Sequence, residues 1–412
     1  MTCLKKIGLA ILLVSLAVVY ADEIMADEFK LIPSIAVRGE YNDNIFYTVD
    51  DTEDDFITTI SAGLELIERT ERLDLDLSAL VSPFYYADYS ILDDVDQNYM
   101  GRVSYKINPS FGVNADALYN VSNRRDRDVE TTGIVASNDK RKRGAFGLGL
   151  DYTMTEKTGM ALSFDYLKDK WDSTNIDRQD LEDYKAVLNF THNLSQFERP
   201  TIGRLNFGFE RYKFEGQDIQ TSDTYNYFTT IGGQHWFSET VNLLVDLGAR
   251  YTDSDFVTPQ LVFVPPSSTE IRIVEINNTG FGGTGQAILE KRGELTRGSI
   301  RIAYGVLPAS GRGTTVQRFD VVLNLRRRLA ERSAIGIATG FYNNKADRNE
   351  FSFRDLDENT FFIRPTIRWE FFDKFTLDAG YIFNYVDDRV DNDDTRRNLV
   401  YLQVAYGLPL FE

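Results

Sequence analysis

Six arginines in the last third of the chain fall in three pairs of even spacing and are the side chains best suited to recognise a ligand. They are Arg297, Arg301, Arg318, Arg326, Arg364 and Arg368. A guanidinium group pairs with a carboxylate through two parallel hydrogen bonds, so a track of arginines suits anionic sugars or polymers. The same groups could instead form internal ion pairs with acids such as Asp320, Glu370 and Asp378, and would then only fill space. Both interpretations stay open at the level of sequence.

The spacing predicts that these arginines share one face of β-strands. Every second residue in the three segments is apolar: Ile300, Ile302, Tyr304 and Val306; Phe319, Val321, Leu323 and Leu325; Phe361, Ile363, Pro365, Ile367 and Trp369. Successive side chains of a strand point to opposite faces. The arginines, Asp320, Asn324 and Glu370 are therefore expected on one face and the apolar residues on the other. A charge facing lipid at mid-membrane costs about 2 to 4 kcal/mol, so we expect the arginines to face a watery interior.

The same two-residue period runs through the chain from residue 32 onward. Phe56, Ile60 and Leu64 alternate with other residues, the turn Thr70-Glu71-Arg72 follows, and Leu73 resumes the period. About 18 segments of this kind can be identified, an even number as in single-chain outer-membrane barrels. We predict strands at 32–41, 55–68, 72–87, 98–107, 110–121, 143–154, 158–170, 182–193, 202–214, 224–236, 241–252, 277–290, 296–306, 315–327, 333–343, 360–371, 375–386 and 397–410.

Short connections alternate with long acidic ones. Turns such as Asn108-Pro109 and Phe372-Asp373-Lys374 alternate with longer connections, among them 122–142, 253–276 and 344–359. Short turns at one rim and long loops at the other are typical of a transmembrane antiparallel up-and-down β-barrel, with both termini in the periplasm. A soluble β-sandwich is the alternative, but it is not expected to keep this asymmetry. In the last strand Val400, Leu402, Val404, Tyr406, Leu408 and Leu410 are expected to face outward, close to Phe411, and this resembles the C-terminal signal read by the barrel-assembly machinery.

The N-terminus has the pattern of a cleavable secretory signal. Lys5 and Lys6 precede an apolar stretch that ends at Ala21, and Asp22 follows at once. The stretch is too short to be read as a spanning helix, although an uncleaved anchor is the alternative. We therefore predict a signal peptide at residues 1–21 and a single outer-membrane barrel domain at 22–412. The chain's one cysteine, Cys3, lies in the signal, so no disulfide or thiolate site is expected in the mature protein.

The composition agrees with this class of protein. Hydrophobic residues make up only 42% of the chain and no other segment is apolar enough for a spanning helix, but a barrel wall needs an apolar residue only at every second position. The 28 Phe and 22 Tyr suit rings at the two membrane interfaces. The formal net charge of −18 argues against nucleic acid as a partner and fits long solvated loops.

The sequence contains no recognisable catalytic or cofactor signature. His192 and His235 both fall near the predicted periplasmic end of a strand, where a structural role is expected. Gly280, Gly282, Gly283 and Gly285 lie within a strand pattern and indicate close packing or a bend rather than a nucleotide site. Three Asp-rich clusters (residues 50–55, 93–96 and 387–394) match no defined calcium loop and are interpreted as solvated surface. We expect no enzyme activity, no metal and no cofactor.

A resemblance narrows the expected role. The segment Ile32-Pro33-Ser34-Ile35-Ala36-Val37-Arg38-Gly39-Glu40-Tyr41-Asn42-Asp43-Asn44-Ile45-Phe46, the spaced Asp55-Phe56-Ile57 and a Ser61-Ala62-Gly63 turn into the second strand resemble the opening of the EpsL-like, porin-like outer-membrane barrel family, often encoded in exopolysaccharide clusters. Ala62 stands where that family more usually has proline, and the likeness covers about the first fifty mature residues. No catalytic residue is implied by it.

The resemblance implies a part in exopolysaccharide export or saccharide passage across the outer membrane. Membrane lipid, the barrel-assembly machinery, the polysaccharide and periplasmic export components are the expected partners. A non-conducting structural or surface-binding barrel and a general diffusion porin are the alternatives. For any channel, the six arginines are the expected contacts.

Overall fold

The computed structural model describes residues 28–125, 139–172, 179–194, 199–216, 221–264, 268–346 and 355–410, and for residues 258–273 only the backbone. The predicted signal segment and Phe411 lie outside these ranges. Within them, no helix is long and apolar enough to span a membrane.

The described chain forms 18 strands and one short 3-10 helix, η2, Ser90–Leu92. The strands are β1 Glu28–Asn42, β2 Asp55–Arg69, β3 Leu73–Tyr86, β4 Asp94–Asn108, β5 Phe111–Ser122, β6 Lys140–Thr153, β7 Thr158–Asp172, β8 Asp180–Asn193, β9 Thr201–Glu215, β10 Thr221–Ser238, β11 Val241–Val264, β12 Ser268–Arg292, β13 Thr296–Ala309, β14 Thr314–Ala330, β15 Ser333–Ala346, β16 Leu356–Phe372, β17 Phe375–Asp388 and β18 Asp393–Gly407.

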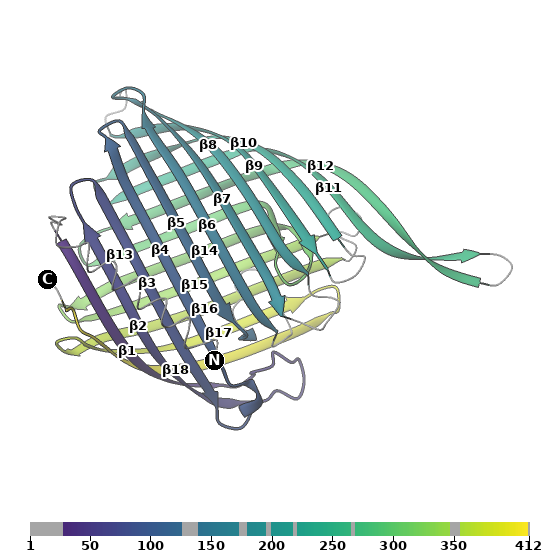
Figure 1. The fold of residues 1–412 in the computed structure, drawn as a ribbon, viewed down its shortest axis with the longest axis horizontal. Coiled ribbons are helices and arrows are strands. Elements are labelled where there is room, and N and C mark those ends of the chain that lie inside the picture. Colours follow the sequence, from purple (N-terminus) through teal and green to yellow (C-terminus); the bar gives the residue numbers. More distant parts are fainter. Residues whose placement is uncertain are drawn as a thin grey trace, which may run out of the picture.

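Each strand pairs antiparallel with its neighbours in sequence, and β1 also pairs with β18, which closes the sheet into a barrel (Figure 1). Closure leaves no free edge over the paired lengths, the condition for a sheet to stand in lipid. The predicted fold class and strand number are confirmed. The short turns gather at one rim, which in barrels of this kind is the periplasmic one, and we call it the short-turn rim.

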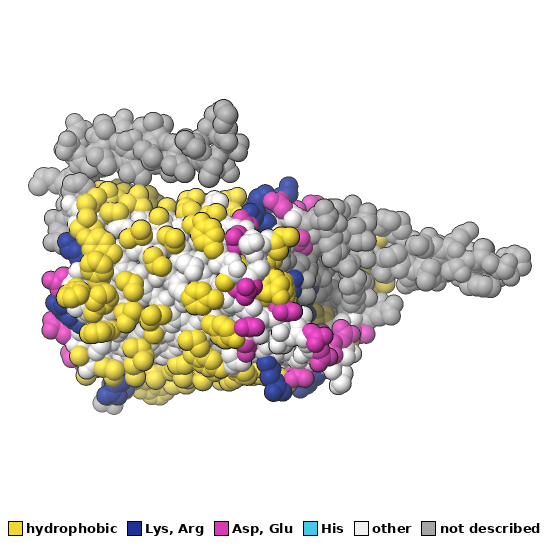
Figure 2. Space-filling view, turned by 90° about the horizontal axis from the view of Figure 1, so that it is seen from below, with side chains coloured by type: hydrophobic (Ala, Val, Ile, Leu, Met, Phe, Trp, Pro, Cys, Tyr) yellow, Lys and Arg dark blue, Asp and Glu magenta, His cyan; other side chains and the backbone are white. Residues whose placement is uncertain are grey.

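The outer face of the wall is apolar, as the two-residue period predicts. Phe56, Ile60, Val400 and Leu402 are exposed on it, and hydrophobic side chains cover the wall in Figure 2. Acidic side chains gather where this band meets the opposite rim, and both signs of charge occur at the short-turn rim. A band of this kind between charged rims is how an outer-membrane β-barrel meets its bilayer.

The segment that follows β1 takes part in barrel closure. The Asp43 carboxylate accepts hydrogen bonds from the backbone N–H and the side-chain amide of Asn398 on β18, both at 2.6 Å. The Asn44 amide donates to the carbonyls of Thr48 and Arg396. The Tyr-Asn-Asp-Asn-Ile-Phe segment therefore ties the first strand's loop to the last strand.

Three sequence predictions about element boundaries are wrong. Residues 253–276 are not a loop: β11 and β12 continue to pair as far as Val264 and Ser268, and this hairpin projects beyond the wall (Figure 1). Ser61-Ala62-Gly63 is not a turn but lies inside β2. The last strand ends at Gly407 rather than Leu410, because Pro409 has no N–H to donate, although Leu408 and Leu410 still bond to Pro33 and Leu31.

The β13–β14 hairpin turns into the barrel interior. Val306, predicted to face lipid, is only 2% exposed and packs against Leu181, Tyr212 and Phe214 on β8 and β9. The Ser310 hydroxyl donates to the Asp169 carboxylate on β7 at 2.5 Å. Gly311 and Gly313 at the tip have positive φ, which glycine adopts without strain. The prediction for Val306 fails because strand alternation holds only while the strand remains in the wall.

Candidate functional site: an arginine-lined lumen

The six predicted arginines do not form one track, because the structure divides them between two cavities in the barrel interior, or lumen. Arg297, Arg326, Arg364 and Arg368 line a cavity of about 900 Å³ near the short-turn rim. Arg301 and Arg318 line a second one of about 290 Å³ that reaches the inward-turned hairpin. The larger cavity is the stronger candidate for anion binding.

Basic side chains dominate the lining of the larger cavity. Arg38, Lys291 and Arg292 join the four predicted arginines there, and Glu290 and Asp378 are the acidic residues of the lining. A surplus of positive charge inside a chain whose net charge is −18 concentrates small anions at this place.

Three arginines stand next to one another on adjacent strands. Arg292 pairs in register with Arg297, and Arg297 pairs with Arg326. Like charges directly opposite one another on a sheet are destabilising, so the barrel retains this row at a cost. In the described part of the chain neither Arg297 nor Arg326 forms an ion pair, whereas Arg292 binds Glu290 at 2.9 Å.

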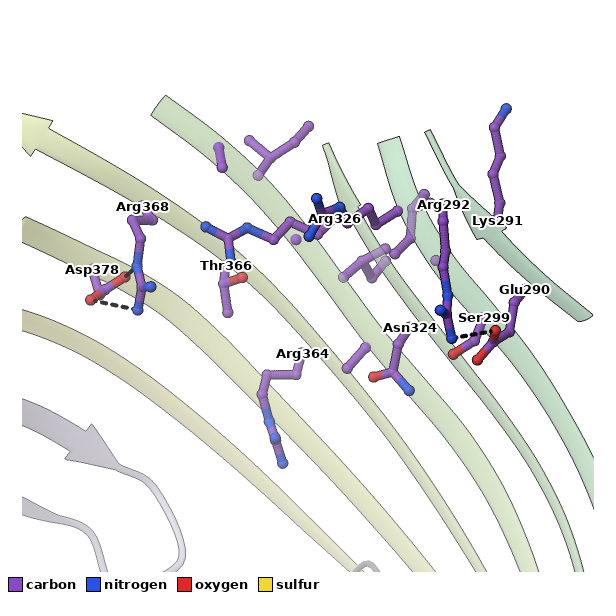
Figure 3. A pocket seen from close by; sticks show the side chains of 18 of the residues that line it. Glu290, Lys291, Arg292, Ser299, Asn324, Arg326, Arg364, Thr366, Arg368 and Asp378 are labelled. Atoms are coloured by element: carbon purple, nitrogen blue, oxygen red, sulfur yellow. Dashed lines mark hydrogen bonds and ion pairs between the residues drawn. The ribbon is translucent and has the colours of Figure 1, made fainter. Parts of the chain in front are cut away.

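The other arginines of this cavity are held by neighbours. Arg368 makes a bidentate pair with Asp378, at 2.6 and 3.2 Å. Arg364 lies 5.6 Å from the centroid of the Phe362 ring. In Figure 3 the Arg326 side chain reaches across toward Thr366, two strands away. The intervening register partner is Gly336, which has no side chain to block that reach.

In the smaller cavity most charged side chains pair with one another, as the ion-pair interpretation predicts. Arg301 lies 3.3 Å from Asp320, and the Arg318 guanidinium lies 4.2 Å from the centroid of the Tyr342 ring. Lys185–Glu210 and Arg204–Asp246 pairs complete its charged lining, at 2.7 and 3.1 Å. Glu370, the remaining predicted acid, forms no ion pair within the described residues.

The inward hairpin narrows the lumen beside these cavities. Besides its bond to Asp169, it is joined to β16 by an Arg312–Glu358 ion pair and to β10 by Thr315 and Thr224 hydroxyls at 3.3 Å. It thus reaches strands on both sides of its own. Sequence reasoning missed it, although residues 306–316 contain no acid, unlike the Asp-rich loops of the same rim.

Two further arginines of the larger cavity were also missed. Arg38 on β1 binds Glu40 at 2.7 Å and lies 3.9 Å from the Tyr401 ring centroid. It enters the cavity because closure brings β1 beside β18. Arg292 lies beyond the predicted strand 277–290, whereas β12 continues through it. Continuing the alternation of inward and outward residues from Glu290 to Arg292 would have predicted that Arg292 faces the lumen.

The remaining candidates have structural surroundings. The Nδ1 atoms of His192 and His235 lie 2.9 and 2.8 Å from the hydroxyls of Thr158 and Thr201 on adjacent strands. A Cβ at Gly285 would lie 2.8 Å from the backbone carbonyl oxygen of Asp246, so close packing explains this glycine. Across the described ranges no three His, Cys, Asp or Glu side chains are grouped to hold a metal ion.

One acidic cluster is not simply solvated surface. Asp55 is 2% exposed, and its carboxylate accepts hydrogen bonds from the backbone N–H groups of Ala87, Asp88 and Tyr89 at 3.0 to 3.3 Å. The prediction fails for Asp55 because the loop after β3 folds over it. Asp50, by contrast, is exposed as predicted.

No protein-family profile matches the chain, and no curated protein sequence does so. Solved structures with a similar course of the chain include the ferric-catecholate import receptor Fiu from E. coli (6% identity, 93% of this chain and 82% of that chain, TM-score 0.46). The siderophore receptor PirA from Pseudomonas aeruginosa is similar over 92% of this chain and 80% of that one, at 10% identity and TM-score 0.44. Acinetobacter baumannii OccAB4 is similar over 94% and 99%, at 9% identity and TM-score 0.44.

Proposed function

We propose that this outer-membrane barrel is a channel for anionic saccharides and that its physiological cargo is an acidic exopolysaccharide or its fragments. The observation that carries the proposal is the Arg292–Arg297–Arg326 row. Its positive charges face a cavity with few acids, so a carboxylated sugar entering the lumen would relieve the repulsion among them. The role is passage of a solute rather than catalysis.

Current block by an oligosaccharide tests this proposal. The purified barrel is inserted in planar bilayers and titrated with an oligogalacturonate and with a neutral oligosaccharide of the same length. We expect the acidic sugar to interrupt the current at lower concentration. Arg326→Gln should weaken its block roughly tenfold, since a charge-assisted hydrogen bond contributes about 1.5 to 3 kcal/mol.

Arg327→Gln is the matched control, because Arg327 follows Arg326 on β14 and points to the opposite face. Equal block by acidic and neutral sugars, or equal effects of the two substitutions, would refute the proposed selectivity. Loss of secreted polysaccharide on deletion of the gene would support the export role specifically, and unchanged secretion would leave a porin for other anions.

A second candidate function is a closed barrel that acts as a scaffold. The inward hairpin favours it, because Val306, Ala309, Thr315 and Val316 are buried inside the lumen. An absence of single-channel conductance in wild type would select this candidate over the channel.

A further inference from the structure

The joint between β12 and β13 is the shortest in the described wall. These strands share eight register pairs, from Arg292–Arg297 to Gly285–Tyr304, whereas β13 and β14 share fourteen. Beyond Tyr304, β13 leaves the wall with the inward hairpin. β12 continues outward and pairs only with β11. One edge of β12 is therefore without a strand partner beyond Gly285.

This unpaired edge begins inside the apolar band. Phe281 on β12 is 80% exposed and pairs in register with the outward-facing Tyr251 of β11. The next outward pair, Asp253 with Thr279, is polar and marks the side of the wall that meets water. The stretch between Phe281 and Gly285 thus lies at the lipid side of an aromatic boundary, where an open sheet edge is costly unless something covers it.

Two cavities meet back to back at this joint. The outer one, of about 370 Å³, is almost wholly apolar and is bounded by Leu247, Ile302 and Phe319. The inner one is the smaller arginine cavity of the lumen. Both are lined by Thr284, Gly285, Gln286, Ala303 and Tyr304. The lumen and the lipid face are separated here by a wall one strand thick.

Small side chains leave space on the outer side of this wall. A Cβ built on Gly283 has no atom within 4 Å, which means open space on the outer side. Across the joint, the Thr284 hydroxyl donates a hydrogen bond of 3.2 Å to the Tyr304 carbonyl. On the inner side, four basic residues face three acidic ones, and Arg301 and Arg318 are the basic pair on the hairpin strands.

We propose that the β12–β13 joint is a lateral binding site for a single-chain anionic amphiphile drawn from the outer leaflet. Its chain lies in the apolar outer cavity, covering the free edge of β12. Its anionic head displaces the Thr284–Tyr304 hydrogen bond and extends toward Arg301 and Arg318. The site is independent of the saccharide proposal and needs no conducting pore.

Electron paramagnetic resonance of spin-labelled stearate tests the proposal. The full-length barrel is reconstituted in phosphatidylcholine vesicles and titrated with stearate carrying a doxyl group near the chain end. We expect a saturable immobilised component at about one site per barrel, beyond what spin-labelled phosphatidylcholine gives. The uncharged methyl ester of the same probe should bind roughly tenfold more weakly, as expected for loss of a charge-assisted hydrogen bond.

Two glycine substitutions provide a matched pair. Gly283→Leu fills the outer cavity and should remove the saturable component, whereas Gly144→Leu on β6, where a Cβ also meets nothing within 4 Å, should leave it intact. Heat-modifiable migration on SDS gels confirms that each variant is folded. Arg318→Gln should weaken stearate but not its methyl ester. Equal immobilised fractions in both glycine variants and wild type would mean ordinary boundary lipid and would overturn the proposal.

Discussion

At the scale of single residues, strand alternation predicts which face each lumen arginine points to, but not which cavity it enters. Parity assigns Arg297 and Arg326 to the interior because each strand stays in the wall at that level. It does not predict that Arg301 and Arg318 belong to a different cavity, since that depends on the inward turn of their own β13–β14 hairpin. Nor does it reveal Asp55, whose burial depends on a loop that begins thirty residues later.

Substitution of Asp55 should therefore behave like a core mutation despite its place in an acidic cluster. Asp55→Ala removes the acceptor for four backbone N–H groups, three of them in the loop after β3, and should lower the free energy of unfolding by roughly 1 to 3 kcal/mol. Urea unfolding from vesicles, followed by tryptophan fluorescence, measures it. Asp50→Ala in the same cluster is the control, with an expected change within about 0.5 kcal/mol. Equal losses in the two variants would contradict the assigned role.

At the scale of elements, the strands of the barrel wall can be predicted from the sequence. The segments that leave the wall cannot. The period of two fixed all 18 strands because lipid on one side and water on the other act on every wall residue alike. The β13–β14 hairpin is governed by other contacts, namely Ser310 with Asp169 and Arg312 with Glu358. The β11–β12 extension was also missed, because this hairpin pairs beyond the wall, where the contrast between lipid and water does not act.

Release of the inward hairpin should widen the lumen. Ser310→Ala combined with Arg312→Gln removes two of its polar contacts, each worth roughly 1 to 3 kcal/mol where a charge takes part. We expect single-channel conductance to rise and brief closures to become more frequent in planar bilayers. Arg389→Gln, in the exposed β17–β18 turn, is the control and should conduct like wild type. Unchanged conductance in the double variant would show that the hairpin does not limit the pore.

At the scale of the whole molecule, charge is arranged in opposite senses inside and outside. Acidic side chains gather at the outer rim, and arginines line the cavity near the short-turn rim (Figures 2 and 3). The sequence predicts the acidic loops from composition and the basic interior from parity. The barrel should thus conduct anions preferentially although the chain itself is strongly acidic, because ions in the lumen pass much closer to the arginines than to the loops.

The anion selectivity should depend on salt concentration, and this dependence tests whether the arginine row causes it. The screening length is about 10 Å at 0.1 M salt and about 3 Å at 1 M. Reversal potentials in KCl gradients should thus indicate clear chloride selectivity near 0.1 M and weak selectivity near 1 M. In Arg297→Gln combined with Arg326→Gln the low-salt preference should fall sharply, because two adjacent charges are lost from the row. Potassium selectivity in wild type at 0.1 M would mean that the acidic rim, rather than the arginine row, controls the passage of ions.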